Sequence, residues 1–211
     1  MLRHVRPHAI FGLVPRDDLV SVIPLPVTHS LTTMLERAVL TALVRLTRPQ
    51  HIFEFGTYQG ETTVLLAANS QAAVFTLDLD AAIRTQGERL FDQFESKNLK
   101  ERLDNPPLFV GTQYEQRITQ IVCDSLDYDE GALGKMVDFT LIDGGHNIEV
   151  VRSDTQKALK MRSNSERACI VWHDYGNTQY EITEYLEGLA QDMPLVHVEE
   201  SQYVFWCPGL V

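Results

Sequence analysis

The chain has 211 residues, of which 44% are hydrophobic and 22% are charged, and its formal net charge at pH 7 is −11. This length is enough to close one sizeable hydrophobic core and does not require a second, so we expect a single globular domain. The excess of acidic residues argues against a nucleic-acid partner, because binding to phosphates draws on clustered Lys and Arg.

Targeting signals and cysteines bear on where the protein works. The first sixteen residues are locally basic, but Pro7 and Pro15 interrupt any secretory or targeting helix, and no apolar stretch approaches the length of a membrane span. Cys123, Cys169 and Cys207 each lie in or beside an apolar run, where a thiol behaves as a small hydrophobic group. We therefore expect a cytoplasmic protein with no membrane partner.

The first element that the sequence predicts is a helix, because apolar residues recur at helical spacing from Leu31 to Leu46. Thr33 and Glu36 fit a capping box at its start, and Pro49 stops the pattern. Residues 1–47 are expected to form an N-terminal helical cap segment, followed by the main domain at residues 48–211.

Beyond this helix, short apolar runs alternate with longer amphipathic ones, a pattern typical of a parallel sheet covered by helices on both faces. The expected strands are residues 51–55, 74–79, 118–123, 137–142 and 168–172, and the expected helices are residues 61–69, around 83–103, 147–162 and 179–190. The last two apolar runs, 195–198 and 203–207, are separated by four residues, too few for a crossover helix, so they predict an antiparallel hairpin. The expected fold class is α/β, a doubly wound, seven-stranded, mostly parallel sheet with one antiparallel strand.

The turn after the first strand carries Glu54, Gly56 and Gly60 in the pattern E-x-G-x-x-x-G. A dinucleotide fingerprint would place glycine at Glu54 and at Gln59, and an acidic residue suits a sulfonium and an ammonium better than a pyrophosphate. The spacing resembles the first motif of class I S-adenosylmethionine-dependent methyltransferases, which have a Rossmann-like fold. The resemblance implies that the glycines let the backbone pass close to the cofactor and that Glu54 meets its charged amino-acid end. A turn with two glycines for steric reasons alone would show the same pattern.

The next two strand ends offer further cofactor candidates. Asp78 suits a carboxylate that accepts two ribose hydroxyls, a feature shared with NAD enzymes, and Asp80 is its alternative. Asp124 falls where members of the resembled family often contact the adenine amino group. Each of these acids is also compatible with a helix cap. Tyr58 and Tyr175 are candidates for stacking on the cofactor, although loop aromatics more often pack against protein.

Two polar clusters follow the fourth and fifth strands, "IDGGH" at residues 142–146 and "HDY" at residues 173–175. We expect these strands to be adjacent, so that two carboxylates and two imidazoles converge. The combination resembles the macrocin O-methyltransferase-like branch and related small-molecule O-methyltransferases, some of which use a divalent metal, and the resemblance covers residues 50–207.

The resemblance implies roles for these residues. Asp143 and Asp174 are candidate ligands for Mg²⁺ or Mn²⁺, and Asp143 is also a candidate contact to the cofactor. Metal-dependent relatives commonly present an acid or amide beside the second Asp, whereas this chain has His173 and Tyr175, and imidazole suits Mn²⁺ better than Mg²⁺. His146 is the candidate general base that takes the proton of an acceptor hydroxyl, and His173 is the rival base.

The sequence therefore predicts an S-adenosylmethionine-dependent methyltransferase acting on a small-molecule hydroxyl, with nitrogen left open as the acceptor atom. Two other classes of protein stay open. One is a nicotinamide-dependent oxidoreductase on a similar sheet, which Glu54 and Gln59 disfavour. The other is an S-adenosylmethionine-binding protein without transfer activity. A homodimer is compatible with the sequence.

Overall fold

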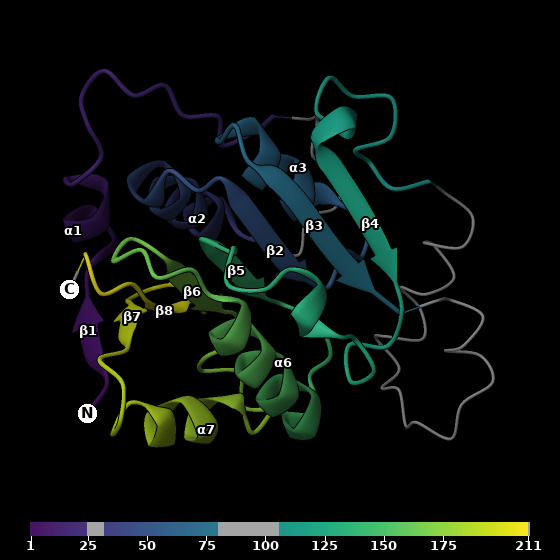
Figure 1. Cartoon of the computed structure of the whole chain (residues 1–211). Coiled ribbons are helices and arrows are strands. Elements are labelled where there is room, and N and C mark those ends of the chain that lie inside the picture. Colours follow the sequence, from purple (N-terminus) through teal and green to yellow (C-terminus); the bar gives the residue numbers. More distant parts are fainter. Residues whose placement is uncertain (25–31, 80–105, 211) are drawn as a thin grey trace.

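The computed structural model describes residues 1–24, 32–79 and 106–210, and its centre is an eight-stranded sheet in the order β1-β7-β8-β6-β5-β2-β3-β4 (Figure 1). Neighbouring strands are parallel except at β8, which runs antiparallel to both β6 and β7. The strands are β1 (Arg3–Val5), β2 (His51–Phe55), β3 (Ala73–Asp78), β4 (Ile118–Val122), β5 (Phe139–Ile142), β6 (Cys169–Trp172), β7 (Val196–Val198) and β8 (Val204–Trp206).

Helices cover both faces of the sheet, as Figure 1 shows. Their bounds are α1 (Pro7–Phe11), α2 (Met34–Thr47), α3 (Glu61–Ala68), α6 (Ile148–Met161) and α7 (Ile182–Leu189), with short 3₁₀ turns η1 (Glu115–Arg117) and η2 (Glu130–Ala132). Because side chains alternate along a strand, Ile52 packs into one hydrophobic core with α1, α2 and α3, while Phe53 packs into another with α6 and α7. The strands are consequently apolar on both faces, which is the continuous pattern seen in the sequence.

The start of α2 is fixed by the predicted capping box. Oγ1 of Thr33 accepts the backbone N–H of Glu36 at 3.2 Å, and Oε2 of Glu36 accepts the backbone N–H of Thr33 at 2.9 Å. These reciprocal bonds satisfy donors that a helix N-terminus would otherwise leave open. They also hold the Glu36 side chain at one place, which matters for the site described below.

The predicted α/β sheet with one reversed strand is confirmed, including the antiparallel β7–β8 hairpin. The structure adds an eighth strand, β1, which pairs in parallel with β7, so residues 1–47 contribute to the sheet as well as supplying α1 and α2. A strand of three residues followed by Pro7 is too short to leave a periodic signal. The predicted helix around 83–103 and Asp80 lie outside the described residues.

The topology places four strand ends together. The chain passes from β2 outward to β3 and β4, then returns to the other side of β2 to form β5 and β6. The carboxyl ends of β2, β3, β5 and β6 therefore meet at the point where the winding reverses, where ligands bind in such sheets. Among the described helices, none is long and apolar enough to cross a membrane.

Candidate active site

A cavity of about 510 Å³ lies at these strand ends, a size typical of small-molecule sites. Its wall comes from the turn after β2, the end of β3, the β5–α6 loop, the segment after β6, the start of α2 and the β7–β8 turn. The lining residues are Thr32, Gly56, Thr57, Tyr58, Gln59, Glu61, Thr62, Asp78, Asp143, Gly144, His146, His173, Asp174, Asn177, Gln179, Tyr180 and Gln202.

Gly56 joins the two halves of this wall. Its φ is +98°, and a Cβ built on it would lie 2.0 Å from the backbone oxygen of Asp143 and 2.8 Å from Cα of Gly144. The expectation that this glycine makes room only for the cofactor is therefore incomplete, because the β5–α6 loop already occupies the space of a side chain. Gly60, at φ +82°, begins α3 against the ring of Phe109 and does not belong to the described cavity wall.

Asp78 organises the turn from the end of β3. Oδ2 of Asp78 accepts the backbone N–H of Tyr58 at 2.8 Å, and Oδ1 accepts the backbone N–H of Leu79 at 2.7 Å. Tyr58 has a φ of +47°, a conformation that is uncommon outside glycine and clusters at functional sites. Both residues line the cavity, and the ribose contact of Asp78 stays a prediction.

Glu54 differs from its expected role. Its side chain is completely buried, and Oε2 accepts hydroxyl hydrogen bonds from Thr63 at 2.5 Å and from Thr76 at 2.6 Å. Burial raises the pKa of the carboxyl to about 8, so it is largely protonated at pH 7. It is absent from the described cavity wall, and a buried neutral acid does not supply the charge that a direct contact with the cofactor ammonium would use.

Two other predicted residues lie away from the described cavity wall. Oδ1 of Asp124 accepts the backbone N–H of Leu126 at 2.9 Å, which closes a local turn after β4. The Tyr175 ring contacts that of His197 with centroids 4.5 Å apart, and its hydroxyl donates to Glu187 at 3.2 Å. The adenine contact of Asp124 stays a prediction, and Tyr175 is a packing residue in this structure.

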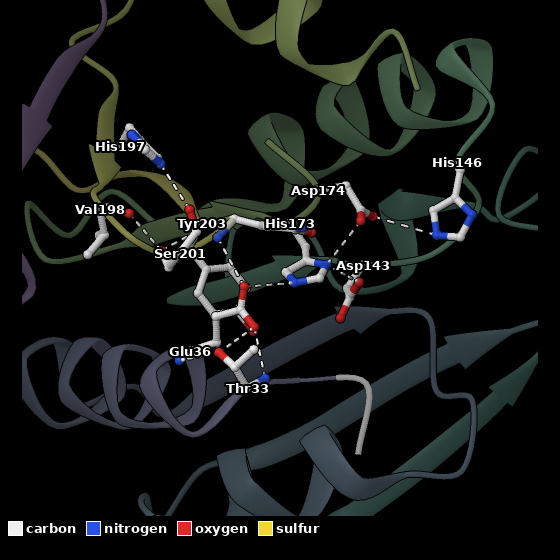
Figure 2. A network of polar contacts seen from close by, with 11 residues as sticks. Thr33, Glu36, Asp143, His146, His173, Asp174, His197, Val198, Ser201 and Tyr203 are labelled. Carbon is white, nitrogen blue, oxygen red and sulfur yellow. Dashed lines mark hydrogen bonds and ion pairs between the residues drawn. The ribbon is translucent and has the colours of Figure 1, made fainter. Parts of the chain in front are cut away.

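The predicted convergence of acids and imidazoles is found at the ends of β5 and β6, which pair directly. Nδ1 of His173 lies 3.1 Å from Oδ1 of Asp143 and 3.5 Å from Oδ1 of Asp174 (Figure 2). One ligand atom from each of the three residues lies within 4.8 Å of the others, a spacing that a single metal ion could bridge. Asp174 has a φ of +65°, so its backbone is strained where its carboxylate joins the cluster.

Glu36 approaches the same imidazole from the opposite side, as Figure 2 shows. Its Oε1 lies 3.5 Å from Nε2 of His173 and accepts the backbone N–H of Gln202 at 3.0 Å. Burial alone would raise the pKa of Glu36, but hydrogen bonds with His173, Thr33 and Gln202 lower it to about 2. Burial likewise opposes charge on His173, yet the carboxylates of Asp143, Asp174 and Glu36 raise the pKa of this imidazole well above its usual value.

His146 lies at the far side of Asp174. Its Nε2 is 3.6 Å from Oδ2 of Asp174, and its ring stacks on that of Tyr180 with centroids 4.2 Å apart and planes inclined by 9°. Both rings line the cavity. The imidazole is thus oriented at the cavity wall beside a carboxylate that would stabilise its protonated form.

Glu36 and Tyr180 were not predicted as site residues. The sequence identified Glu36 only as a helix cap, because its contact with Gln202 joins residues 166 positions apart. Tyr180 belongs to no sequence motif that would have indicated a role in the site. The cavity residue Glu61 is paired with Arg37, a buried side chain on α2 that the sequence also left without a role.

Comparison with known proteins places this site in a family. A family model described as a methyltransferase domain matches residues 53–175, from β2 to the end of the "HDY" segment. The match spans more than half of the chain, so the protein belongs to the methyltransferase domain family. Its fold and family together make it a class I S-adenosylmethionine-dependent methyltransferase. A search of curated protein sequences gives no significant match.

Solved structures agree with the fold at low sequence identity. A Staphylococcus aureus protein provisionally described as a caffeoyl-CoA O-methyltransferase is 13% identical with a TM-score of 0.59, covering 85% of this chain and 83% of the other. The Podospora anserina methyltransferase PaMTH1, bound to S-adenosylhomocysteine, is 14% identical with a TM-score of 0.55, and the match covers 83% of this chain and 80% of the other. The O-methyltransferase TomG of Streptomyces achromogenes, in complex with S-adenosylmethionine, is 17% identical with a TM-score of 0.50, and the match covers 79% of this chain and 75% of the other.

Proposed function

We propose that the protein transfers the methyl group of S-adenosylmethionine to a hydroxyl of a small molecule. The observation that carries this proposal is one cavity with two unlike walls, Asp78 at the end of β3 and the Asp143, His173 and Asp174 cluster at the ends of β5 and β6. The O-methyltransferases among the similar structures support hydroxyl oxygen as the acceptor atom.

The cofactor fits the wall formed by the first two strand ends. Asp78 is suited to accept ribose hydroxyls, Tyr58 lines the same wall, and the Gly56 backbone packs closely against the β5–α6 loop. Asp143, in the β5–α6 loop that touches Gly56, would receive the ammonium group at Oδ2, the oxygen that does not face His173. Glu54 supports this region from below through its bonds to Thr63 and Thr76.

His146 is the proposed base. As the acceptor oxygen bonds to the methyl carbon, the carbon–sulfur bond breaks, its electron pair stays on sulfur, and the hydroxyl proton passes to the His146 imidazole. The nearby carboxylate of Asp174 stabilises the imidazolium that results. Tyr180 holds the ring in place by stacking, so little reorganisation is needed during transfer.

Asp143 and Asp174 are the proposed ligands of a divalent ion. The spacing of the cluster and its two carboxylates fit such an ion, whose contribution when bound is to lower the pKa of the acceptor hydroxyl.

A transfer assay with S-adenosylmethionine labelled with carbon-13 at the methyl group tests the proposal. The purified protein is incubated with the labelled cofactor and a small-molecule cell extract, and the carbon-13 shift of the product distinguishes O-methyl from N-methyl groups. We expect an O-methyl signal that the His146→Ala variant loses. An N-methyl product would contradict the acceptor assignment, and cofactor binding without any transfer would favour the non-catalytic alternative.

A further inference from the structure

The contacts of His173 differ between its two ring nitrogens. Nδ1 faces the strand-end carboxylates, 3.1 Å from Asp143 and 3.5 Å from Asp174, whereas Nε2 faces only Glu36 among the contacts found in the described residues, at 3.5 Å. Figure 2 shows the ring held between these two sides, with Tyr203 beside it at a centroid distance of 5.0 Å. The ring is therefore fixed both in position and in direction.

Charge in this cluster is unbalanced. Glu36, Asp143 and Asp174 bring three formal negative charges, while His173 and His146, whose Nε2 lies 3.6 Å from Asp174, bring at most two positive charges. All three acids are at most about a quarter exposed, with side-chain exposures of 4%, 23% and 11%. Carboxylates held this close with limited solvent favour an additional cation.

We infer that Glu36 is a positioning residue of this cluster: its carboxylate pairs with Nε2 of His173, 3.5 Å away, and so presents Nδ1 to a divalent transition-metal ion shared with Asp143 and Asp174. The inference rests on the proposed metal site and specifies which ion it takes. A metal-bound imidazole commonly donates its other N–H to a carboxylate, which fixes the ring orientation and makes the ligating nitrogen more basic. On ligation the Nδ1 proton leaves to solvent and the metal takes its place.

The donor set determines the ion. One imidazole nitrogen with two carboxylates suits Mn²⁺, Co²⁺ or Zn²⁺, while Mg²⁺ prefers oxygen ligands only. The site thus has a nitrogen ligand, from His173, where an all-oxygen site would have an oxygen, and Glu36 orients the ring so that this nitrogen can bind the ion. Because Glu36 sits in the first turn of α2, the helix N-terminus and the metal site are joined through a single side chain.

The capping role of Glu36 can be separated from this second role. Glutamine at the same position of a capping box still reaches back to the N-cap backbone, so Glu36→Gln keeps the cap and removes the charge that orients His173. Thr33→Ala is the control: it removes the hydroxyl that donates to Oε2 of Glu36 at 2.8 Å, but the backbone N–H of Thr33 still donates to Oε2 and the charge beside His173 is kept.

The test is isothermal titration of chelator-treated protein with MnCl₂ and, separately, MgCl₂. We expect wild type to bind Mn²⁺ at least ten times more tightly than Mg²⁺, Glu36→Gln to weaken Mn²⁺ binding by about 10- to 100-fold, and Thr33→Ala to leave it unchanged. Equal affinities for the two ions, absence of Mn²⁺ binding, or a folded Glu36→Gln protein with wild-type affinity would each overturn the inference.

A second measurement needs no variant. Pulsed electron paramagnetic resonance of Mn²⁺-loaded wild type should show coupling to a directly bound nitrogen, and an all-oxygen spectrum would overturn the inference even if Glu36→Gln fails to fold. Titration with S-adenosylmethionine in parallel separates the two proposals. Cofactor binding without Mn²⁺ binding removes only this inference, whereas Mn²⁺ binding without cofactor binding removes only the proposed function.

Discussion

The two walls of the cavity are built in different ways. The wall at β2 and β3 comes from residues 56 to 78, and hydrogen bonds within that segment hold it, such as Asp78 to the backbone N–H of Tyr58 and Thr57 to Thr76. The wall at β5 and β6 gathers side chains from α2, the β5–α6 loop, the end of β6 and the β7–β8 turn. The first wall is formed by residues close together in the sequence, while the second is a charged cluster formed by segments far apart in the sequence.

Their buried glutamates show the same contrast. Glu54, below the first wall, is hydrogen-bonded to two hydroxyls, and its pKa rises to about 8. Glu36, which contacts His173 of the second wall but does not line the cavity itself, meets this imidazole and two backbone N–H groups, and its pKa falls to about 2. One acid is therefore a neutral support at pH 7 and the other is a fixed charge, although both are buried.

The largest effect is expected at Gly56, where the two walls touch. Gly56→Val places a β-branched side chain at positive φ against the Asp143 carbonyl, and we expect it to abolish S-adenosylmethionine binding and lower the free energy of unfolding by about 3 kcal/mol or more. Calorimetry and urea unfolding measure the two losses. Gly111→Val is the matched control, because Gly111 has φ +77° but open space around it, and it should cost much less. Equal costs at both glycines would mean that contact between the walls is unimportant.

His146 tests the chemistry of the second wall alone. His146→Ala should lower kcat by about 10² to 10⁴, the usual contribution of a positioned base, while cofactor affinity stays near that of wild type because Asp78 is untouched. Steady-state kinetics with the acceptor found in the transfer assay measures this. If His173→Ala gives that pattern and His146→Ala only destabilises the fold, the base belongs to β6.

Glu54 gives a pH-dependent effect in the first wall. Its folded pKa of about 8 lies above the ordinary value of 4.5, so the folded state binds the extra proton, and the stability contributed by Glu54 is complete below about pH 4.5 and is lost as pH rises through 8. Glu54→Gln should therefore match wild type near pH 5 and exceed its free energy of unfolding by about 1 to 3 kcal/mol at pH 9. Urea unfolding at both pH values checks this, and a variant less stable than wild type at pH 9 would mean that Glu54 acts as a charged group.

The smallest effect is expected from the ring that orients His146. Tyr180→Leu removes the stacking and should lower kcat by about 2- to 10-fold, since an aromatic pair contributes roughly 0.5–1.5 kcal/mol. Tyr180→Phe keeps the ring and should stay within about twofold of wild type. If both variants lose activity equally, the Tyr180 hydroxyl, rather than its stacking, matters to the reaction.

Sequence reasoning succeeded where structure depends on neighbouring residues. The capping box of α2, the strands from β2 onward and the hairpin follow from periodicity and spacing, and adjacent β5 and β6 follow from the winding of such sheets. The encounter of Asp143 with His173 and Asp174 could be predicted because all three follow parallel strands.

Three features could not be predicted. Whether Glu54 points into the cavity or below it depends on Thr63 and Thr76, which the E-x-G-x-x-x-G pattern does not include. The second role of Glu36 depends on a contact with the β7–β8 turn, and β1 is too short to show a strand period. In each case the deciding partner lies outside the motif.

The central claim is that the cavity between the two walls binds S-adenosylmethionine, and calorimetry with S-adenosylmethionine and NAD in parallel tests it most directly. We expect wild type to bind S-adenosylmethionine with one site and not NAD, and Asp78→Ala to weaken that binding at least tenfold because the ribose hydroxyls lose their acceptor. Binding of NAD without S-adenosylmethionine, or an Asp78→Ala variant with wild-type affinity, would contradict the account.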